Sequence, residues 1–268
     1  MTLFDIRNAS YRYREATALD SVSLSILRGQ RVAILGANGS GKSTFLRLLD
    51  GLYIAQYGSV SFDGIPLNEE TLADEKFLFD FRRRVGFVFQ NPDIQLFSPT
   101  VFDELAFGPL QLRWPREKII GEVDAMLDRM NLTQLKHRVP HRLSGGEKKR
   151  VALASVMILD PEVLLLDEPT AALDPRSQSQ MIDFLWECRG SKTVVTATHD
   201  LEIVQDIADL CIVFEGGRIA AIDTPSRILA DDALLKRTSL IHANRHRHAF
   251  GVHSHPHLHR SHDHPHSH

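Results

Sequence analysis

A glycine-rich segment constrains the fold more than any other feature of the sequence. Gly36–Ser43 (GANGSGKS) fits the pattern G-x-x-x-x-G-K-[ST] in full, with the apolar run Val32–Leu35 before it and the helix-like Thr44–Leu49 after it. Glycines let such a loop turn its backbone N–H groups around phosphate oxygens, and the start of the following helix adds a favourable field. The sequence therefore predicts a strand–loop–helix unit that binds the phosphates of a nucleotide.

Further short apolar runs end at polar residues. Continuous apolar strands of this kind are typical of a parallel sheet that is buried on both faces and carries its site at the carboxyl edge. Helical periodicity dominates between residues 100 and 157, and Gly216-Gly217 predicts a hairpin between two later strands. We therefore expect an α/β fold with a helical insertion. The runs and the residues that follow them are Val85–Phe89 with Gln90, Val163–Leu166 with Asp167 and Glu168, and Thr193–Thr198 with His199.

Four side chains in these segments suit nucleotide chemistry. Lys42 would reach the β- and γ-phosphates, and the hydroxyl of Ser43 would ligate Mg²⁺. Asp167 would hold the same ion, and Glu168 would orient or deprotonate the attacking water. An Asp-Glu pair after a strand is weak support by itself, since solvated strand ends are common, but the phosphate loop strengthens this interpretation.

The composition is that of an ordinary globular protein. The 268 residues carry a net charge of -3 with histidine neutral, so nucleic acid is not an expected partner. The longest apolar stretch, Val151–Leu159, is far too short for a spanning helix, and Met1–Arg7 has no signal-peptide core. Cys188 and Cys211 fit no metal-ligand or redox spacing. We expect a cytoplasmic protein.

The end of the chain has a different composition. The segment from His242 to His268 holds eleven of the fourteen histidines, interleaved with Ser, Arg, Pro and Asp. Such a segment cannot bury enough apolar surface to offset the entropy lost on ordering it. We expect a folded domain over residues 1–240 and a disordered, His-rich tail over residues 241–268.

One motif resembles the signature of a known family. Leu143–Glu147 (LSGGE), followed by three basic residues and a helix-like apolar stretch, is similar to the signature of ABC transporter ATPases, with Glu147 where glutamine is usual. The resemblance covers nearly all of residues 2–235. It implies a phosphate-loop NTPase core with a mixed sheet, an antiparallel β subdomain and a helical signature subdomain at residues 96–157.

The same resemblance implies roles for individual residues. Gln90 resembles the Q-loop glutamine, His199 the switch histidine and Asp174 the D-loop aspartate. Tyr13 is similar to the aromatic residue that stacks on adenine, with Tyr11 as the alternative. ATP would contact Tyr13, Gly36, Asn38, Gly39, Ser40, Gly41, Lys42, Ser43 and Thr44. Mg²⁺ would bind Ser43, Gln90 and Asp167, and catalysis would use Glu168, His199, Gln90 and Lys42.

The signature glycines form a second expected anion site, because they precede a helix. They lie too far along the helical insertion to reach the nucleotide of their own chain. The family resolves this with a head-to-tail dimer, in which Ser144, Gly145, Gly146 and Glu147 of one subunit close the ATP site of the other. The resemblance thus implies a second ATPase subunit, identical or different.

A narrower resemblance concerns Phe89–Phe97 and Phe102–Pro109, which are similar to energy-coupling-factor ATPases. Those proteins drive uptake of vitamins and transition metals in prokaryotes. The resemblance implies a groove that receives coupling helices of a transmembrane energy-coupling subunit, with a substrate-binding membrane subunit beside it. The chain would then be peripheral, on the cytoplasmic face of the cell membrane.

The tail suggests a cargo. Neutral imidazole is a good ligand for nickel, cobalt, copper and zinc. We hypothesise that the chain belongs to a nickel or cobalt importer, uses ATP and Mg²⁺, and binds Ni²⁺ or Co²⁺ through the tail. The histidines that alternate along it are His253, His255, His257, His259, His262, His264, His266 and His268.

Other interpretations stay open. The ATPase could serve a vitamin importer and carry an incidental tail. A soluble, nucleotide-dependent metal storage or delivery protein is a second alternative, although such a protein needs neither the signature nor the segment Gln90–Pro109. The tail could also be functionless or a purification tag, although tags usually have uninterrupted histidines.

Overall fold

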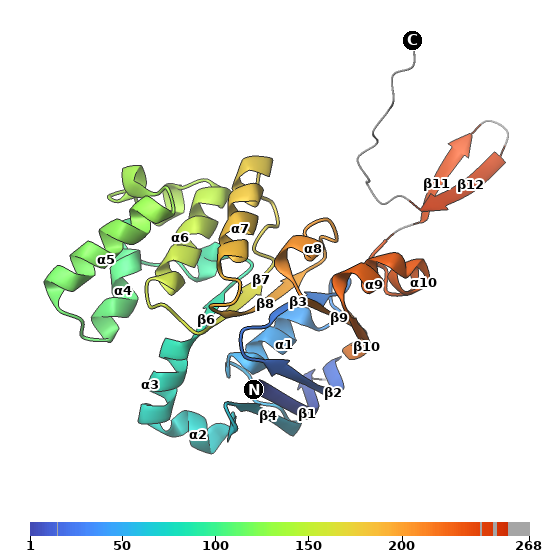
Figure 1. The fold of residues 1–268 in the computed structure, drawn as a ribbon, viewed down its shortest axis with the longest axis horizontal. Helices are drawn as coiled ribbons and strands as arrows, with labels where there is room; N and C mark the ends of the chain where they lie inside the picture. The colour runs from blue at the N-terminus through green and yellow to red at the C-terminus, as the bar shows by residue number, and fades with distance from the viewer. Residues whose placement is uncertain (15, 242, 249–250, 257–268) are drawn as a thin grey trace, which may run out of the picture.

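A six-stranded sheet forms the centre of the computed structural model, which describes residues 1–14, 16–241, 243–248 and 251–256 (Figure 1). Its strand order is β10-β9-β3-β8-β7-β6. The first pair is antiparallel and the others are parallel, so the predicted mixed sheet is confirmed. The strands are β3 (Arg31–Leu35), β6 (Val85–Val88), β7 (Val163–Asp167), β8 (Thr193–Thr198), β9 (Leu210–Glu215) and β10 (Arg218–Asp223).

Both faces of this sheet are covered, which explains the continuous apolar runs. Successive side chains of a strand point to opposite faces. Accordingly, Val32 and Ile34 of β3 pack with α1 and the N-terminal strands, whereas Ala33 and Leu35 pack with the helices of the opposite face. Every residue of β3, β7 and β8 is buried.

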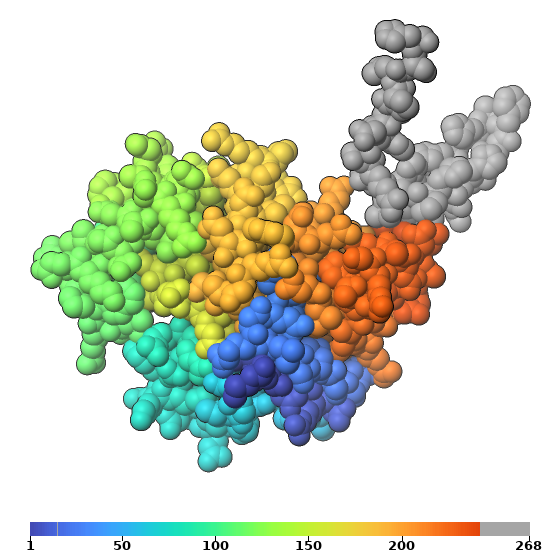
Figure 2. All heavy atoms as spheres, in the orientation of Figure 1, coloured from blue at the N-terminus to red at the C-terminus, as the bar shows by residue number. Residues whose placement is uncertain are grey.

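Two helical groups flank the sheet. α1 lies on one face, and the other face is covered by helices that include α4 to α8 (Figure 1). The helices α4, α5 and α6 form a lobe at one side of the molecule (Figure 2). The longer helices are α1 (Lys42–Leu49), α3 (Glu75–Arg84), α4 (Val101–Gln111), α5 (Arg116–Arg129), α6 (Gly145–Met157) and α7 (Pro175–Glu187). The shorter ones are α2 (Glu69–Ala73), α8 (Val204–Ile207), α9 (Pro225–Ala230) and α10 (Asp232–Arg237).

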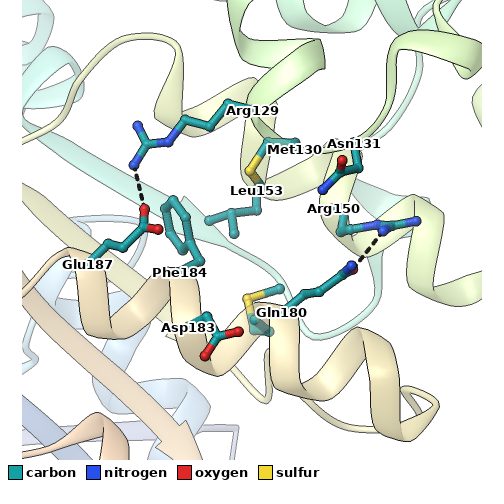
Figure 3. Close-up of a pocket in the computed structure, with 10 residues that line it drawn as sticks. Arg129, Met130, Asn131, Arg150, Leu153, Gln180, Asp183, Phe184 and Glu187 are labelled. Atoms are coloured by element: carbon teal, nitrogen blue, oxygen red, sulfur yellow. Dashed lines mark hydrogen bonds and ion pairs between the residues drawn. The ribbon is translucent and has the colours of Figure 1, made fainter.

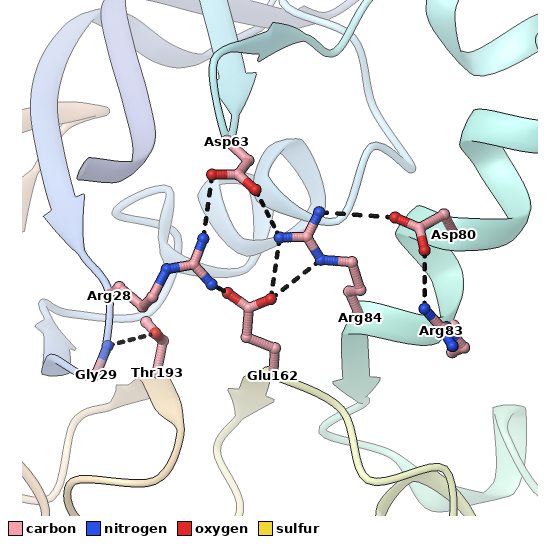
Figure 4. A network of polar contacts seen from close by, with 8 residues as sticks. All are labelled: Arg28, Gly29, Asp63, Asp80, Arg83, Arg84, Glu162 and Thr193. Carbon is pink, nitrogen blue, oxygen red and sulfur yellow. Dashed lines mark hydrogen bonds and ion pairs between the residues drawn. The ribbon is translucent and has the colours of Figure 1, made fainter. Parts of the chain in front are cut away.

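An antiparallel sheet in the order β2-β1-β4-β5 packs over α1. Its strands are β1 (Thr2–Tyr13), β2 (Ala16–Leu27), β4 (Tyr57–Phe62) and β5 (Ile65–Pro66). A charge network ties it to the central sheet, since Arg84 pairs with both Asp63 (2.7 Å) and Glu162 (3.0 Å), and Arg28 pairs with the same two carboxylates (Figure 4). This network anchors the edges of the two sheets that lie away from the phosphate loop.

The chain after Ile241 is consistent with the expected disordered tail, and where the structure describes it, the tail forms only a hairpin. Strands β11 (Ala243–His248) and β12 (Gly251–Pro256) pair antiparallel with each other and form a separate two-stranded sheet. A lone hairpin is only marginally stable in water, because it has no third strand or helix to cover it. Histidines 257, 259, 262, 264, 266 and 268 lie outside the described residues.

Among the described residues, every helix is too short or too polar to cross a membrane.

Candidate active site

The phosphate loop lies at the carboxyl end of β3, between that strand and α1. Its glycines are required by close contacts: a Cβ on Gly36 would come within 2.6 Å of the carbonyl oxygen of Phe214, and one on Gly41 within 2.6 Å of that of Ala18. Gly39 has φ +79, and a Cβ there would meet open space. Gly36 and Gly41 therefore allow close packing of the loop, and Gly39 allows a left-handed turn on the open side of the loop.

Lys42 is 6% exposed, and its Nζ donates to the carbonyl oxygens of Gly36 (2.7 Å) and Ala37 (3.1 Å). Burial lowers the pKa of Lys42, while the charges of Glu168 and Asp167 act in the opposite direction. The ammonium group thus lies inside the loop, 3.9 Å from Oε1 of Glu168. A phosphate in the loop would give this buried cation a stronger partner than two carbonyls.

Two oxygen ligands suited to Mg²⁺ already lie side by side. The Ser43 hydroxyl donates to Oδ1 of Asp167 at 3.0 Å, and burial raises the pKa of Asp167. A divalent cation would favour the charged form of this carboxylate, and oxygen ligands of this kind are those that Mg²⁺ prefers. Among the residues that the structure describes, none is a hydrogen-bond partner for the hydroxyl of Ser40, which is buried in the same loop. The residues therefore fit a nucleotide phosphate with its magnesium ion.

Glu168 follows β7 directly and contacts His199, which follows β8. Oε1 of Glu168 lies 2.9 Å from Nδ1 of His199, and the glutamate side chain is 5% exposed. Because β7 and β8 are parallel neighbours, their carboxyl ends meet at one edge of the sheet. The two polar residues predicted to end these strands are thus in direct contact.

One cavity of about 550 Å³ joins most of the predicted ATP site. Gln90, at the end of β6, and Glu168 line it together with the phosphate loop. Tyr13 also lines it, and its hydroxyl lies 3.2 Å from Oγ1 of Thr44. Tyr11 instead stacks on Tyr53 with ring centroids 4.8 Å apart, so the geometry favours Tyr13 at the cavity. The predicted residues lining the cavity are Tyr13, Asn38, Gly39, Gly41, Lys42, Ser43, Thr44, Gln90 and Glu168.

The hairpin turn Gly216-Gly217 supports the phosphate loop, a role not foreseen from the sequence. Both residues have positive φ, which matches the predicted two-residue turn. The N–H of Gly217 donates to the carbonyl of Ser40 at 3.0 Å, and a Cβ on Gly217 would lie 2.8 Å from the carbonyl oxygen of Ala18. The sequence showed the pair Gly216-Gly217 as a turn signal. Its contact with Ser40 joins residues that are far apart in the chain, so it depends on the tertiary structure.

The signature residues are not part of this cavity. Ser144 caps α6, and Glu147 accepts from the N–H of Ser144 at 2.8 Å, forming a capping box. That contact is the main reason why the pKa of Glu147 lies below its usual value. The side of this helix start formed by Ser144 and Gly145 is exposed. Within the described part of the chain, none of the residues from Leu143 to Glu147 lines the phosphate-loop cavity.

Asp174 is also engaged within its own chain. It caps α7 by accepting from the N–H (3.1 Å) and the hydroxyl (2.6 Å) of Ser177, and these bonds lower its pKa. The turn before it, Ala171–Leu173, lines a cleft together with Glu168 and His199. The predicted D-loop therefore adjoins the carboxylate, while the carboxyl group of Asp174 itself is used as a helix cap.

A second cavity, of about 220 Å³, lies between α5, α6 and α7 (Figure 3). Arg129 pairs with Glu187 across it at 3.1 Å, and Arg150 donates to Gln180 at 2.9 Å. The first contact connects α5 to α7, and the second connects α6 to α7. None of the predicted ATP-site residues lines this cavity.

The fold and the cavity together define an ATP-binding cassette. A phosphate loop lies between β3 and α1, and α6 has a glycine-rich start on a lateral helical lobe. Residues 19–171 match the ABC transporter family model. The chain belongs to the ABC transporter family and is an ATPase of it. ATPases of this family use ATP and Mg²⁺.

Two relatives are similar to this chain along most of its length. The chain is 52% identical over 242 residues to the nickel import ATP-binding protein NikO of Rhodobacter capsulatus, covering 89% of this chain and 95% of that protein. It is 41% identical to the energy-coupling factor transporter ATP-binding protein EcfA of Methanothermobacter thermautotrophicus, covering 89% of this chain and 76% of that protein. The predicted resemblance to energy-coupling-factor ATPases is thereby confirmed.

Two solved structures have the same fold. CbiO1 from Clostridium perfringens, part of the ABC transporter complex CbiONQ, matches with a TM-score of 0.74 and 35% identity over 89% of this chain and 95% of that chain. A dimeric bacterial ABC transporter cassette matches with a TM-score of 0.75 and 28% identity over 83% of this chain and 99% of that chain. The predicted ABC ATPase fold is therefore confirmed.

Proposed function

We propose that this chain is the ATPase subunit of an energy-coupling-factor transporter that imports nickel or cobalt. The observation that carries the proposal is the 52% identity to a nickel import ATP-binding protein along 95% of that protein's length. The structural likeness to a subunit of the complex CbiONQ supports the same class of transporter. The partners would be a transmembrane energy-coupling subunit and a substrate-binding membrane subunit, with the chain peripheral on the cytoplasmic face.

We propose the following division of labour in the site. Lys42 and the backbone N–H groups of the phosphate loop hold the phosphates, and Tyr13 stacks on the adenine. Ser43, Asp167 and Gln90 hold Mg²⁺, which neutralises charge on the phosphate oxygens when it is bound. Glu168 accepts a proton from the attacking water. This assignment rests on the direct contact between Ser43 and Asp167 and on one shared cavity, which is lined by Tyr13, Lys42, Ser43, Gln90 and Glu168.

His199 would keep the Glu168 carboxylate in position. Its Nδ1 contacts Oε1 of Glu168, while its ring is more than half exposed on the side of the cleft. An imidazole in this place can donate to the carboxylate and still reach a group arriving from outside with its other nitrogen. We assign His199 to orienting Glu168 and sensing the phosphate that lies beside it.

The site would be completed by a second ATPase subunit, identical or different. The start of α6 is exposed at Ser144 and Gly145, and neither residue lines the described phosphate-loop cavity of its own chain. Helix starts of this kind attract anions. A head-to-tail partner would bring Ser144, Gly145, Gly146 and Glu147 onto the ATP held by the phosphate loop.

The tail would bind the transported metal. Its alternating histidines suit Ni²⁺ and Co²⁺, and they supply neutral imidazole near neutral pH. In the described part of the chain, no group of three or more His, Cys, Asp or Glu side chains is arranged to hold a metal ion. The tail is therefore the part of the chain in which we propose that metal is held.

Uptake measurements would test the transporter assignment. The chain would be expressed with its co-purifying membrane subunits in cells that lack their own nickel and cobalt importers, and Ni²⁺, Co²⁺ and B-vitamin uptake would be measured. We expect metal uptake that a Glu168→Gln chain abolishes. Vitamin uptake without metal uptake would favour the vitamin importer. Absence of any membrane partner after purification would favour a soluble metal storage or delivery protein.

A further inference from the structure

A buried lysine near the start of α6 reaches the backbone of the turn that carries Glu168. Lys149 is 8% exposed, and its Nζ donates to the carbonyl oxygens of Glu168 (2.8 Å) and Ala171 (2.5 Å). Lysine is seldom buried so deeply unless its ammonium group has partners. Both partners lie in the segment 168–171, between β7 and α7. The two hydrogen bonds therefore link the helix with the second anion site to the proposed catalytic carboxylate.

The backbone of Glu168 has an unusual conformation. Its φ is +49°, a left-handed value that few residues other than glycine adopt. Its N–H donates to the carbonyl of Ala197 at 2.9 Å, which fixes the residue on the β8 side. Its carbonyl is held by Lys149 and by the N–H of Ala171 at 3.2 Å. Conformations of this kind persist only where the surroundings hold them in place.

The direction of the Glu168 side chain depends on this conformation. Oε1 lies 2.9 Å from Nδ1 of His199 and 3.9 Å from Nζ of Lys42. With β7 held in the sheet, a change of φ at Glu168 would turn the Cα–Cβ bond and move the carboxylate away from both. Burial, the larger effect, lowers the pKa of Lys149. The charges of Glu168 and Asp167 act in the opposite direction, so Lys149 also interacts electrostatically with these two carboxylates.

We infer that Lys149 is a positioning residue for ATP hydrolysis, which holds the turn 168–171 so that the Glu168 carboxylate faces the phosphate loop. The inference rests on the proposed role of Glu168. It adds a physical link between the two anion sites of the chain. A shift of the start of α6 on contact with a partner's nucleotide would be passed to Glu168 through the Lys149 side chain.

Purified Lys149→Met protein tests the inference. Methionine keeps the apolar length of lysine but removes the ammonium donor that the two carbonyls share, so that the Glu168 carbonyl keeps only the bond from Ala171. We expect kcat for ATP hydrolysis to fall at least tenfold, with KM and Kd for ATP unchanged within twofold. Lys149→Gln keeps two N–H donors and should recover part of kcat. A wild-type kcat in Lys149→Met would overturn the inference.

Lys192 provides a matched control. Its Nζ donates to the carbonyl of Pro161 at 2.7 Å, close to the opposite end of β7, so Lys192→Met removes a similar lysine–carbonyl bond far from the phosphate loop. We expect wild-type kcat for this variant. An equal fall of kcat in both variants would show a general loss of packing around β7 and would overturn the specific role of Lys149.

A double-mutant cycle separates this inference from the proposed role of Glu168. Because Lys149 acts through Glu168, Lys149→Met should not slow single-turnover hydrolysis further in a Glu168→Gln background. Additive losses would overturn the inference. If Glu168→Gln alone kept wild-type activity, the proposed role of Glu168 would be wrong, together with what rests on it. If Glu168→Gln were inactive and Lys149→Met fully active, only the role of Lys149 would be wrong.

Discussion

The imidazole Nδ1 of His199 lies 2.9 Å from Oε1 of Glu168, although 31 positions separate the two residues in the chain. The carboxylate is buried, whereas the imidazole side chain is 56% exposed. The histidine therefore covers the solvent side of the carboxylate. The two strands that end at these residues bring one proton acceptor and one titratable ring to the same point beside the phosphate loop.

Replacement of Glu168 by glutamine should separate binding from hydrolysis. The amide keeps the shape of the side chain but accepts a proton poorly, so we expect kcat to fall by about 10²–10⁴-fold. ATP binding should persist and favour a dimer that gel filtration with Mg-ATP detects. Lys42→Ala should instead fail at nucleotide binding. Hydrolysis by Glu168→Gln at the wild-type rate would show that Glu168 is not the base.

His199→Ala should lower kcat more than it raises KM. The variant loses the contact that orients Glu168, and we expect a fall of about 10²-fold in steady-state hydrolysis. His137→Ala, an exposed histidine of the helical lobe, serves as the control and should be fully active. If both variants hydrolyse ATP equally well, the contact with Glu168 has no functional role.

Complementation would test whether the start of α6 acts on a partner's nucleotide. Gly145 is exposed, and a Cβ there would meet open space, so Gly145→Asp should fold but repel phosphate. Gly145→Ala adds a methyl group without charge and controls for size. Gly145→Asp and Lys42→Ala proteins should each be inactive.

In a mixture of these two inactive proteins, every heterodimer would contain one intact phosphate loop facing one intact α6 start. We therefore expect the mixture to regain part of the wild-type ATPase rate if the chain forms homodimers. A mixture as inactive as its components, from proteins shown to exchange subunits, would argue that each chain completes its own site.

Removal of the tail should abolish metal binding without affecting basal ATP hydrolysis. We expect the full chain, but not a chain ending after Ile241, to bind Ni²⁺ or Co²⁺ in calorimetry. A full-length chain with asparagine in place of the tail histidines controls for the loss of length. Because imidazole must be neutral to bind metal, binding should weaken as the pH falls below about 6. Equal stoichiometry for full and shortened chains would remove the tail from the proposal.

Asp50 should make stability depend on pH. It lies at the end of α1, and burial raises its pKa to about 6, although Arg82 donates to it at 2.8 Å. Between the ordinary pKa of 3.8 and this value, the folded chain keeps a proton that the unfolded chain has lost. A rise from pH 5 to pH 7 should thus lower the free energy of unfolding by about 1 kcal/mol through this group.

Asp50→Asn lacks this titration. The free energy of unfolding of the variant, measured in urea, should therefore gain about 1 kcal/mol relative to wild type over the same pH interval. Arg82 keeps its bond to the backbone carbonyl of residue 50 in both proteins. Parallel pH profiles for the two proteins would mean that the carboxylate is not desolvated as the structure indicates.

The sequence alone determined the local units of this protein. The loop Gly36–Ser43 predicted a strand, a turn and a helix, and the structure has β3 and α1 at those places, because glycine spacing and apolar runs act within a few residues. The same reasoning placed Asp167 and Glu168 at the end of a buried strand. The antiparallel pairing of β11 with β12 was not foreseen, because a histidine-rich composition gives no strand signal.

Only the tertiary structure decided which of these units touch. The order of β7 and β8 places Glu168 against His199, the strand bearing Tyr13 brings its hydroxyl to Thr44, and the hairpin glycine Gly217 supports the loop at Ser40. In the sequence, Lys149 is one of three consecutive basic residues and has no distinguishing signal. Only the packing of α6 against the turn after β7 brings its Nζ to the carbonyl of Glu168. Such contacts depend on how sheets and helices that are distant in the chain pack together. Patterns that extend over a few residues cannot predict them.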